Sequence, residues 1–86
     1  MSLEYDPEKN NLNLLKHGIT FEQGQKIWDD HHYALIKART IDDPRYLAIG
    51  MIDSKCWSAI FTVREESISI ISVRRARPEE VDIYES

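Results

Sequence analysis

The hydrophobic pattern of this chain changes its period near residue 29, and this change limits the folds open to it. Before residue 29 apolar residues recur at helical spacing, and after it they alternate with polar residues at the period of two typical of β-strands. The alternation is clearest in Trp57–Arg64, whose odd-numbered residues are all apolar. Strand-like runs also cover Arg45–Ile52 and Ser67–Arg75, with short turns between the three. Short turns between consecutive strands predict an antiparallel meander.

The last of these runs, Ser67–Arg75, does not keep its apolar residues on one face. Ile68 and Ile70 fall on one side of the predicted strand, whereas Ile71 and Val73 fall on the other. A strand with this pattern is either covered on both faces or bulged near Ile70 and Ile71. The sequence leaves both alternatives open.

Two helices are predicted ahead of the strands. The first begins after Asp6, an N-cap acid that precedes a proline, and it runs to about Lys16 before Gly18 ends it. The second begins at Thr20, which has the spacing of a capping box with Gln23. A glycine inside this helix, at position 24, costs about 1 kcal/mol relative to alanine and therefore suggests close packing against a neighbour.

Weaker signals complete the predicted domain. Short strands are predicted at Leu3–Tyr5 and His32–Ile36, a polar connection covers residues 37–44, and Pro78 begins a last helix. We therefore predict a single α+β domain over residues 1–86, in which two N-terminal helices pack on an antiparallel β-sheet and a short C-terminal helix follows it.

Positive charge is concentrated in one segment of an acidic chain. The chain carries 11 basic and 15 acidic side chains, a formal charge of −4. Residues 54–78 carry five basic and two acidic side chains, whereas residues 79–86 carry four acidic side chains and no basic one. The negative total argues against non-specific adhesion to nucleic acid or to an anionic membrane, although it is compatible with a local anion site.

The basic segment ends in three arginines, Arg74, Arg75 and Arg77. Arginine matches phosphate with two parallel hydrogen bonds, so a phosphate-rich ligand is one interpretation. The alternative is a strand end whose arginines pair with the acidic tail that follows. Lys16 and His17 add basic groups at the end of the first helix, where the position of the histidine taken alone favours the role of a helix-capping cation.

The predicted meander does not bring every basic residue to one place. Arg45 begins its first strand and Arg64 ends its second, so both lie at one end of the sheet. Arg74 and Arg75 end the third strand and therefore lie at the opposite end. We predict no single site that holds all of these residues.

Other catalytic constellations are missing from the sequence. It contains no glycine-rich phosphate loop, no paired cysteine–histidine spacing and no Gly-x-Ser-x-Gly elbow. The adjacent His31 and His32 would point to opposite sides of a strand, so we predict neither a metal site nor a cofactor. A single cysteine, with no signal-peptide pattern and no long apolar run, predicts a cytoplasmic protein without a membrane partner.

Two blocks of the sequence match a known family pattern. Residues 6–22 follow D-P-x-K-x3-N-x2-K-H-G-[VI]-x-F-E, and residues 70–76 read I-I-S-V-R-R-A where the family has I-I-S-A-R-[RK]-A. Trp28-Asp29-Asp30 stands in place of its F-D-D, and Glu80 and Tyr84 match its closing acid and tyrosine. The chain thus resembles the BrnT family, small ribonuclease toxins of type II toxin–antitoxin modules with a RelE-like fold.

The resemblance implies an activity, partners and a set of site residues. The activity is translation arrest by RNA cleavage, through metal-independent attack of a ribose 2′-hydroxyl on the adjacent phosphate. The partners are the RNA substrate and a BrnA-type antitoxin, through which the module reaches operator DNA only indirectly. The implied site residues are Lys16 and His17 for proton transfer or phosphate contact, Arg45, Arg74 and Arg75 for phosphate positioning, and Tyr84 for stacking or proton donation.

The chain departs from the family pattern at two positions. Ser69 stands where members often carry an arginine, so one cation is missing from that face, and Gly24 replaces a usual alanine. Two alternatives follow for the function. One is a protein-binding module whose basic strand end docks an acidic partner helix, and the other is a degenerate toxin that acts only by binding its antitoxin in a repressor complex.

Overall fold

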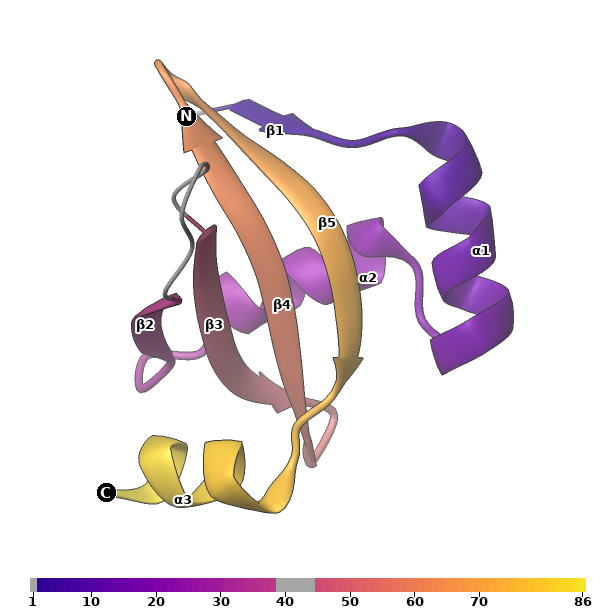
Figure 1. The fold of residues 1–86 in the computed structure, drawn as a ribbon. Coiled ribbons are helices and arrows are strands. Elements are labelled where there is room, and N and C mark those ends of the chain that lie inside the picture. Colours follow the sequence, from indigo (N-terminus) through magenta and orange to yellow (C-terminus); the bar gives the residue numbers. More distant parts are fainter. Residues whose placement is uncertain (1, 39–44) are drawn as a thin grey trace.

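The computed structural model describes residues 2–38 and 45–86 of the chain (Figure 1). The predicted connection over residues 37–44 therefore lies mostly outside the described residues. The elements, in chain order, are β1 (Ser2–Glu4), α1 (Pro7–His17), α2 (Phe21–Gly24), the 3₁₀ helix η1 (Gln25–Asp29), β2 (Ala34–Ala38), β3 (Arg45–Ile52), β4 (Lys55–Arg64), β5 (Ser67–Arg75) and α3 (Pro78–Glu85). The fold is α+β, as predicted.

The strands form one sheet in the order β1-β5-β4-β3-β2. β2 to β5 are antiparallel, which confirms the meander, and β1 adds a parallel partner to the first half of β5. Ile71 is the extra residue of a bulge in β5, since Ile70 and Ser72 pair with consecutive residues of β4. The bulge turns Ile70 and Val73 to the same face, where both are buried. Of the two alternatives for this strand, the structure confirms the bulge.

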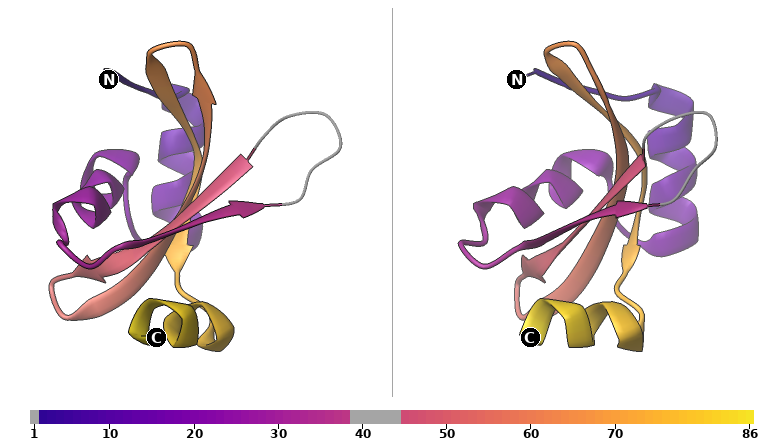
Figure 2. Two further views of the ribbon diagram at one scale, coloured as in Figure 1. Left: turned by 90° about the vertical axis from the view of Figure 1, so that its left-hand side faces the viewer. Right: turned by 60° about the vertical axis from the view of Figure 1, so that its left-hand side comes forward.

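One face of the sheet packs against α2 and η1, and the core lies between these layers (Figure 2). Phe21 and Ile27 are fully buried on the helical side and pack over apolar residues of the three central strands. A Cβ added to Gly24 would lie 2.6 Å from a methyl carbon of Val73, so the helix approaches β5 closely at this point. The packing suggested by this glycine is confirmed. We call the opposite side of the sheet the outer face.

The second predicted helix is present but changes its geometry. The α-helical turn that begins at Phe21 has the expected capping box, in which Thr20 and Gln23 each accept a hydrogen bond from the other's backbone N–H. After Gly24 the chain continues as the tighter 3₁₀ helix η1. This helix brings Ile27 against Gly50 of β3, where a Cβ would lie 3.0 Å from the isoleucine side chain.

Helix α1 lies along the edge of β5 rather than on a face of the sheet (Figure 1). The buried side chain of Asn13 accepts a hydrogen bond from the backbone N–H of Val73 at 3.0 Å and donates to its carbonyl oxygen at 2.8 Å. It thereby takes the place of a neighbouring strand beyond the point where β1 ends. The prediction that both N-terminal helices pack on the sheet therefore needs this correction for α1. Hydrogen bonds between Asn13 and the edge of β5 attach α1 to the sheet.

Helix α3 crosses the lower end of the sheet in Figure 1, beyond the last residues of β5. It contacts β3 and carries one buried residue, Glu80. No helix in residues 2–38 and 45–86 is long and apolar enough to span a membrane.

Candidate active site

A shallow groove of about 260 Å³ runs between α1 and the outer face of β5. On the helix, Lys9, Asn13, Lys16 and His17 share one side because they are spaced by three or four residues. On the strand, the bulged residue and its neighbour complete the lining, which consists of Lys9, Leu12, Asn13, Lys16, His17, Ile71 and Ser72. The groove therefore brings together two of the predicted site residues, Lys16 and His17, in a basic surface.

His17 is the titratable group of this groove whose surroundings favour the neutral form. It is the last residue of α1 and is half-buried. Desolvation lowers its pKa below the usual 6.5, and the positive charges of Lys16 and Arg74 lower it further. A histidine with this shift is mainly neutral at pH 7 and can accept a proton. Its position beside two other cations disfavours the alternative role of a charged helix cap.

Arg74 is held by an ion pair with Glu80 of α3. Its two terminal nitrogens donate to the two carboxylate oxygens at 2.7 and 2.8 Å, and the side chains are only 18% and 9% exposed. Glu80 also accepts hydrogen bonds from the Ser58 hydroxyl and from the backbone N–H of Arg77, the N-cap of α3. These contacts lower the pKa of Glu80 to about 2, with Arg74 as the largest cause. For Arg74, pairing with the acidic tail is the interpretation that the structure confirms.

The ion pair limits what Arg74 offers to a ligand. Of the five N–H bonds of a guanidinium group, two donate to Glu80 and a third donates to the carbonyl oxygen of Arg75 at 3.3 Å. Arg74 thus keeps donors and a fixed orientation, while Glu80 balances its charge. The positive charge of Arg74 still acts on His17, but the ion pair makes Arg74 bind phosphate more weakly than an unpaired arginine would.

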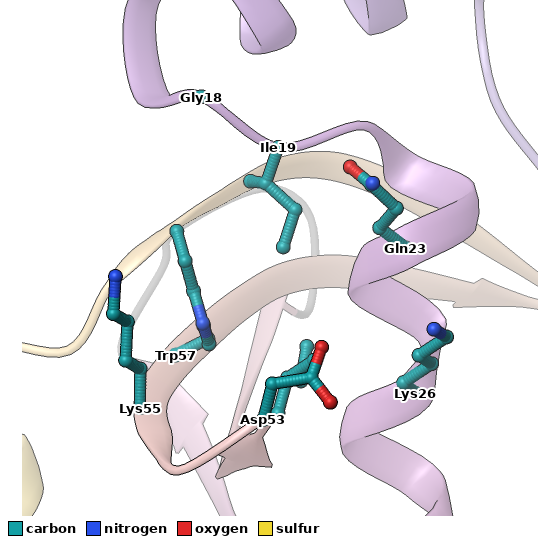
Figure 3. Close-up of a pocket in the computed structure, with 8 residues that line it drawn as sticks. Gly18, Ile19, Gln23, Lys26, Asp53, Lys55 and Trp57 are labelled. Carbon is teal, nitrogen blue, oxygen red and sulfur yellow. The ribbon is translucent and has the colours of Figure 1, made fainter.

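Arg75 belongs to the other side of the sheet. Neighbouring residues of a strand point to opposite faces, and the guanidinium of Arg75 lies over the ring of Trp57, 5.4 Å from its centroid. Trp57 forms one wall of a separate pocket of about 260 Å³, with Gln23 and Lys26 on the wall across from it (Figure 3). The Arg74–Arg75 pair is therefore divided between two surfaces.

Arg45 lies on the outer face but does not line the groove. It pairs with Thr62 of β4, whereas Arg74 pairs with Ser58, four residues along the same strand. Four residues at about 3.3 Å each and two strand spacings of about 4.8 Å separate the two arginines by about 16 Å. The predicted placement of Arg45 and Arg74 at opposite ends of the sheet is confirmed.

Tyr84 is engaged in a contact of its own. Its hydroxyl donates to Asp30 at 2.5 Å, and this hydrogen bond is the main reason that its pKa rises to about 12. Asp30 also accepts from the backbone N–H groups of His32 and Met51. This contact ties α3 to the end of η1 and to β3. None of the residues that line the groove takes part in it, and a raised pKa makes Tyr84 a poorer proton donor.

A family model described as "Ribonuclease toxin, BrnT, of type II toxin-antitoxin system" matches residues 5–80. The chain belongs to the BrnT family. The match spans the groove, both motif blocks and Glu80, whereas Tyr84 lies beyond it. A search of curated proteins finds no match to the sequence. Membership of this family implies a protein antitoxin as partner.

In this BrnT-family chain, the two residues that differ from the family pattern and the adjacent His31 and His32 do not line the groove. Ser69 pairs with Thr62, which by strand alternation puts it on the outer face with Arg45 and Arg74. His31 and His32 lie in the exposed turn between η1 and β2. In the described part of the chain, no three His, Cys, Asp or Glu side chains are grouped closely enough to hold a metal ion.

Sequence reasoning missed the two supports of the groove. Asn13 appeared only as a motif letter, although an asparagine one helical turn from Lys9 and from His17 signals a polar side of α1. For Glu80, the sequence indicates pairing between the arginines and the acidic tail but does not single out Glu80 as the partner of Arg74. The sequence does hold a sign of its capping role. Glu80 stands three residues after Arg77, at the N3 position of the helix that Pro78 begins.

Proposed function

We propose that this BrnT-family chain is an endoribonuclease whose reaction takes place in the groove between α1 and β5 without a metal ion. The observation that supports this most is a half-buried histidine in the groove, His17, whose pKa is lowered by desolvation and by the charges of Lys16 and Arg74. RNA cleavage by its own 2′-hydroxyl needs a proton acceptor and cations near the phosphorus. The groove offers both.

In the proposed reaction His17 accepts the proton of the ribose 2′-hydroxyl. The 2′-oxygen forms a bond to phosphorus, the bond from phosphorus to the 5′-oxygen breaks, and that oxygen takes a proton from water. The hydroxide left behind takes the proton held by His17, which restores the neutral histidine and the water. The products are a 2′,3′-cyclic phosphate and a 5′-hydroxyl end. Lys16 stabilises the charge of the phosphorane. Arg74, which lies two residues along β5 from Ser72 and is fixed by Glu80, donates hydrogen bonds from outside the groove lining.

The remaining candidates serve substrate binding in this proposal. Arg45, about 16 Å from Arg74 by strand spacing, contacts a distant phosphate of the same RNA across the outer face. Arg75 and Trp57 present a cation and an aromatic ring, groups on which unpaired bases stack. We assign Tyr84 to anchoring α3 through Asp30 rather than to proton donation.

We also propose that the chain adopts a RelE-like arrangement and that its antitoxin is of the BrnA type, which contacts operator DNA on behalf of the complex. A second candidate function is a toxin-fold protein that acts only through its antitoxin. Two observations favour it: Glu80 neutralises Arg74, and Ser69 replaces a cation on the outer face. The two candidates differ in whether RNA is cut.

The test is RNA cleavage by purified protein in buffer with EDTA. We expect cleavage that leaves cyclic phosphate ends and an acid limb of the pH–rate profile with its midpoint below 6.5, because the pKa of His17 is lowered. His17→Gln should reduce the rate by about 10²-fold or more, whereas His31→Gln, an exposed histidine outside the groove, should keep it. Antitoxin binding without cleavage would favour the second candidate, and inhibition by EDTA would exclude the metal-independent mechanism.

A further inference from the structure

Helix α1 turns its apolar side chains outward. Leu12, Leu14 and Leu15 are 62%, 45% and 83% exposed, while the buried residue of the helix is Asn13. A surface helix ordinarily buries its leucines and exposes its amides. Because Asn13 attaches α1 through hydrogen bonds to β5, the fold does not use these leucines.

The exposed leucines are concentrated in this helix. Other large apolar side chains that are more than a third exposed come from separate elements, such as Leu35 of β2, Val63 of β4 and Ile83 of α3. Among the described residues, only α1 gathers three within four positions. At about 100° per helical residue, Leu12 and Leu15 lie on one side of α1, whereas Leu14 points to nearly the opposite side from Leu12. An exposed apolar strip such as the one formed by Leu12 and Leu15 is typical of a protein-binding surface.

Charge makes this surface asymmetric. Lys9 and Lys16 lie on the side of α1 that borders the groove, together with Leu12, which lines the groove itself. Leu15 lies further out, on the adjoining side of the helix. A partner that covers the leucines therefore meets lysines along one flank, and acidic side chains there would complement them. The same partner would cover the mouth of the groove.

We propose that the surface formed by Leu12 and Leu15 with Lys9 and Lys16 is the docking site of the antitoxin. Its occupant is an amphipathic helix of the antitoxin, with apolar residues against the leucines and acidic residues along the lysine flank. Binding there blocks the groove directly. The inference rests on the proposed antitoxin partner and is independent of the ribonuclease chemistry.

The test compares antitoxin binding by three toxin variants in calorimetry. Leu15→Asp should raise the Kd at least 30-fold, since it removes apolar contact and places a negative charge against an acidic partner. Leu15→Lys removes the same apolar contact but adds a positive charge. The increase in its Kd should therefore be several times smaller than the increase for Leu15→Asp. Leu35→Asp changes an exposed leucine outside the surface and should stay within threefold of the unmodified chain. Circular dichroism checks that each variant keeps its helix content.

Each outcome decides one point. If the unmodified chain binds no antitoxin, the proposed partner is wrong and the inference falls with it. If the chain binds but Leu15→Asp binds equally well, the docking surface is wrong while the partner stands. A dimer of the toxin alone that Leu15→Asp dissociates would show a second copy on this surface and would overturn the inference. In cleavage assays, Leu15→Asp should cut RNA at the normal rate and resist inhibition by the antitoxin.

Discussion

The two sides of β5 are held by opposite kinds of interaction. On its inner side, α2 packs by shape, with Gly24 directly over Val73 and fully buried apolar side chains around them. Along its edge, α1 is attached by the amide of Asn13, and at its end Arg74 is attached to α3 by an ion pair. Packing by shape buries the apolar side chains of α2 and η1. Attachment by hydrogen bonds and an ion pair leaves the leucines of α1 and the cations beside them exposed to a ligand or partner. This difference explains why the groove and the proposed docking surface lie on the polar side.

The polar attachment of α1 should be the most costly contact to break. Asn13→Ala leaves the N–H and carbonyl of Val73 and the carbonyl of Ile19 without their partner. At about 1–3 kcal/mol for each buried group left unpaired, we expect a loss of about 4 kcal/mol, measured by urea unfolding. Asn11→Ala, an exposed asparagine of the same helix, should change stability by less than about 0.5 kcal/mol. Equal effects would show that α1 is not held at this edge.

The ion pair at the end of β5 should make the polar side sensitive to acid. Glu80 has a pKa of about 2 in the fold against an ordinary 4.5, so the contact is fully stabilising above pH 4.5 and is lost as pH falls towards 2. A shift of this size corresponds to about 3 kcal/mol at neutral pH. We expect Glu80→Gln to lose about this much at pH 7 and to flatten the pH dependence of unfolding below pH 4.5. An unchanged acid transition would contradict the assignment.

The shape-based side should respond to a single added carbon. Gly24→Ala places a Cβ 2.6 Å from a methyl of Val73, and we expect a net loss of about 1 kcal/mol, since overpacking outweighs the gain in helix propensity. Val73→Ala in the same chain removes the clash, so the two changes should couple favourably by about 1 kcal/mol in a double-mutant cycle. Simple additivity would show that α2 can move away from β5. This contact should be insensitive to pH.

The sequence predicted the local elements well and the attachments poorly. Period-two runs and the capping box at Thr20 are consequences of a few neighbouring residues, and both are present. For the last strand the sequence left a bulge and burial on both faces open, and the structure shows the bulge. The attachment of α1 depends on Asn13 meeting Val73, 60 residues away. No hydrophobic periodicity predicts a contact between a helix residue and a strand residue so far apart in the sequence.

The candidate site shows the same division between neighbouring and distant residues. Lys16 and His17 were predicted together because they are adjacent, and they do line one groove. Arg74 and Arg75 were predicted together for the same reason, but strand alternation sends them to different surfaces. Tyr84 was assigned from its motif position, and its commitment to Asp30 depends on how α3 crosses the sheet.

By itself the sequence determined the α+β class, the meander, the family and the separation of Arg45 from Arg74, because each depends on the order of residues along the chain. Only the tertiary structure decided that Asn13 would be buried and the leucines exposed, and that Arg74 would be paired with Glu80. The physical reason is that backbone groups at a strand edge and a buried carboxylate require polar partners. Which distant side chains supply them is settled only when the elements pack together.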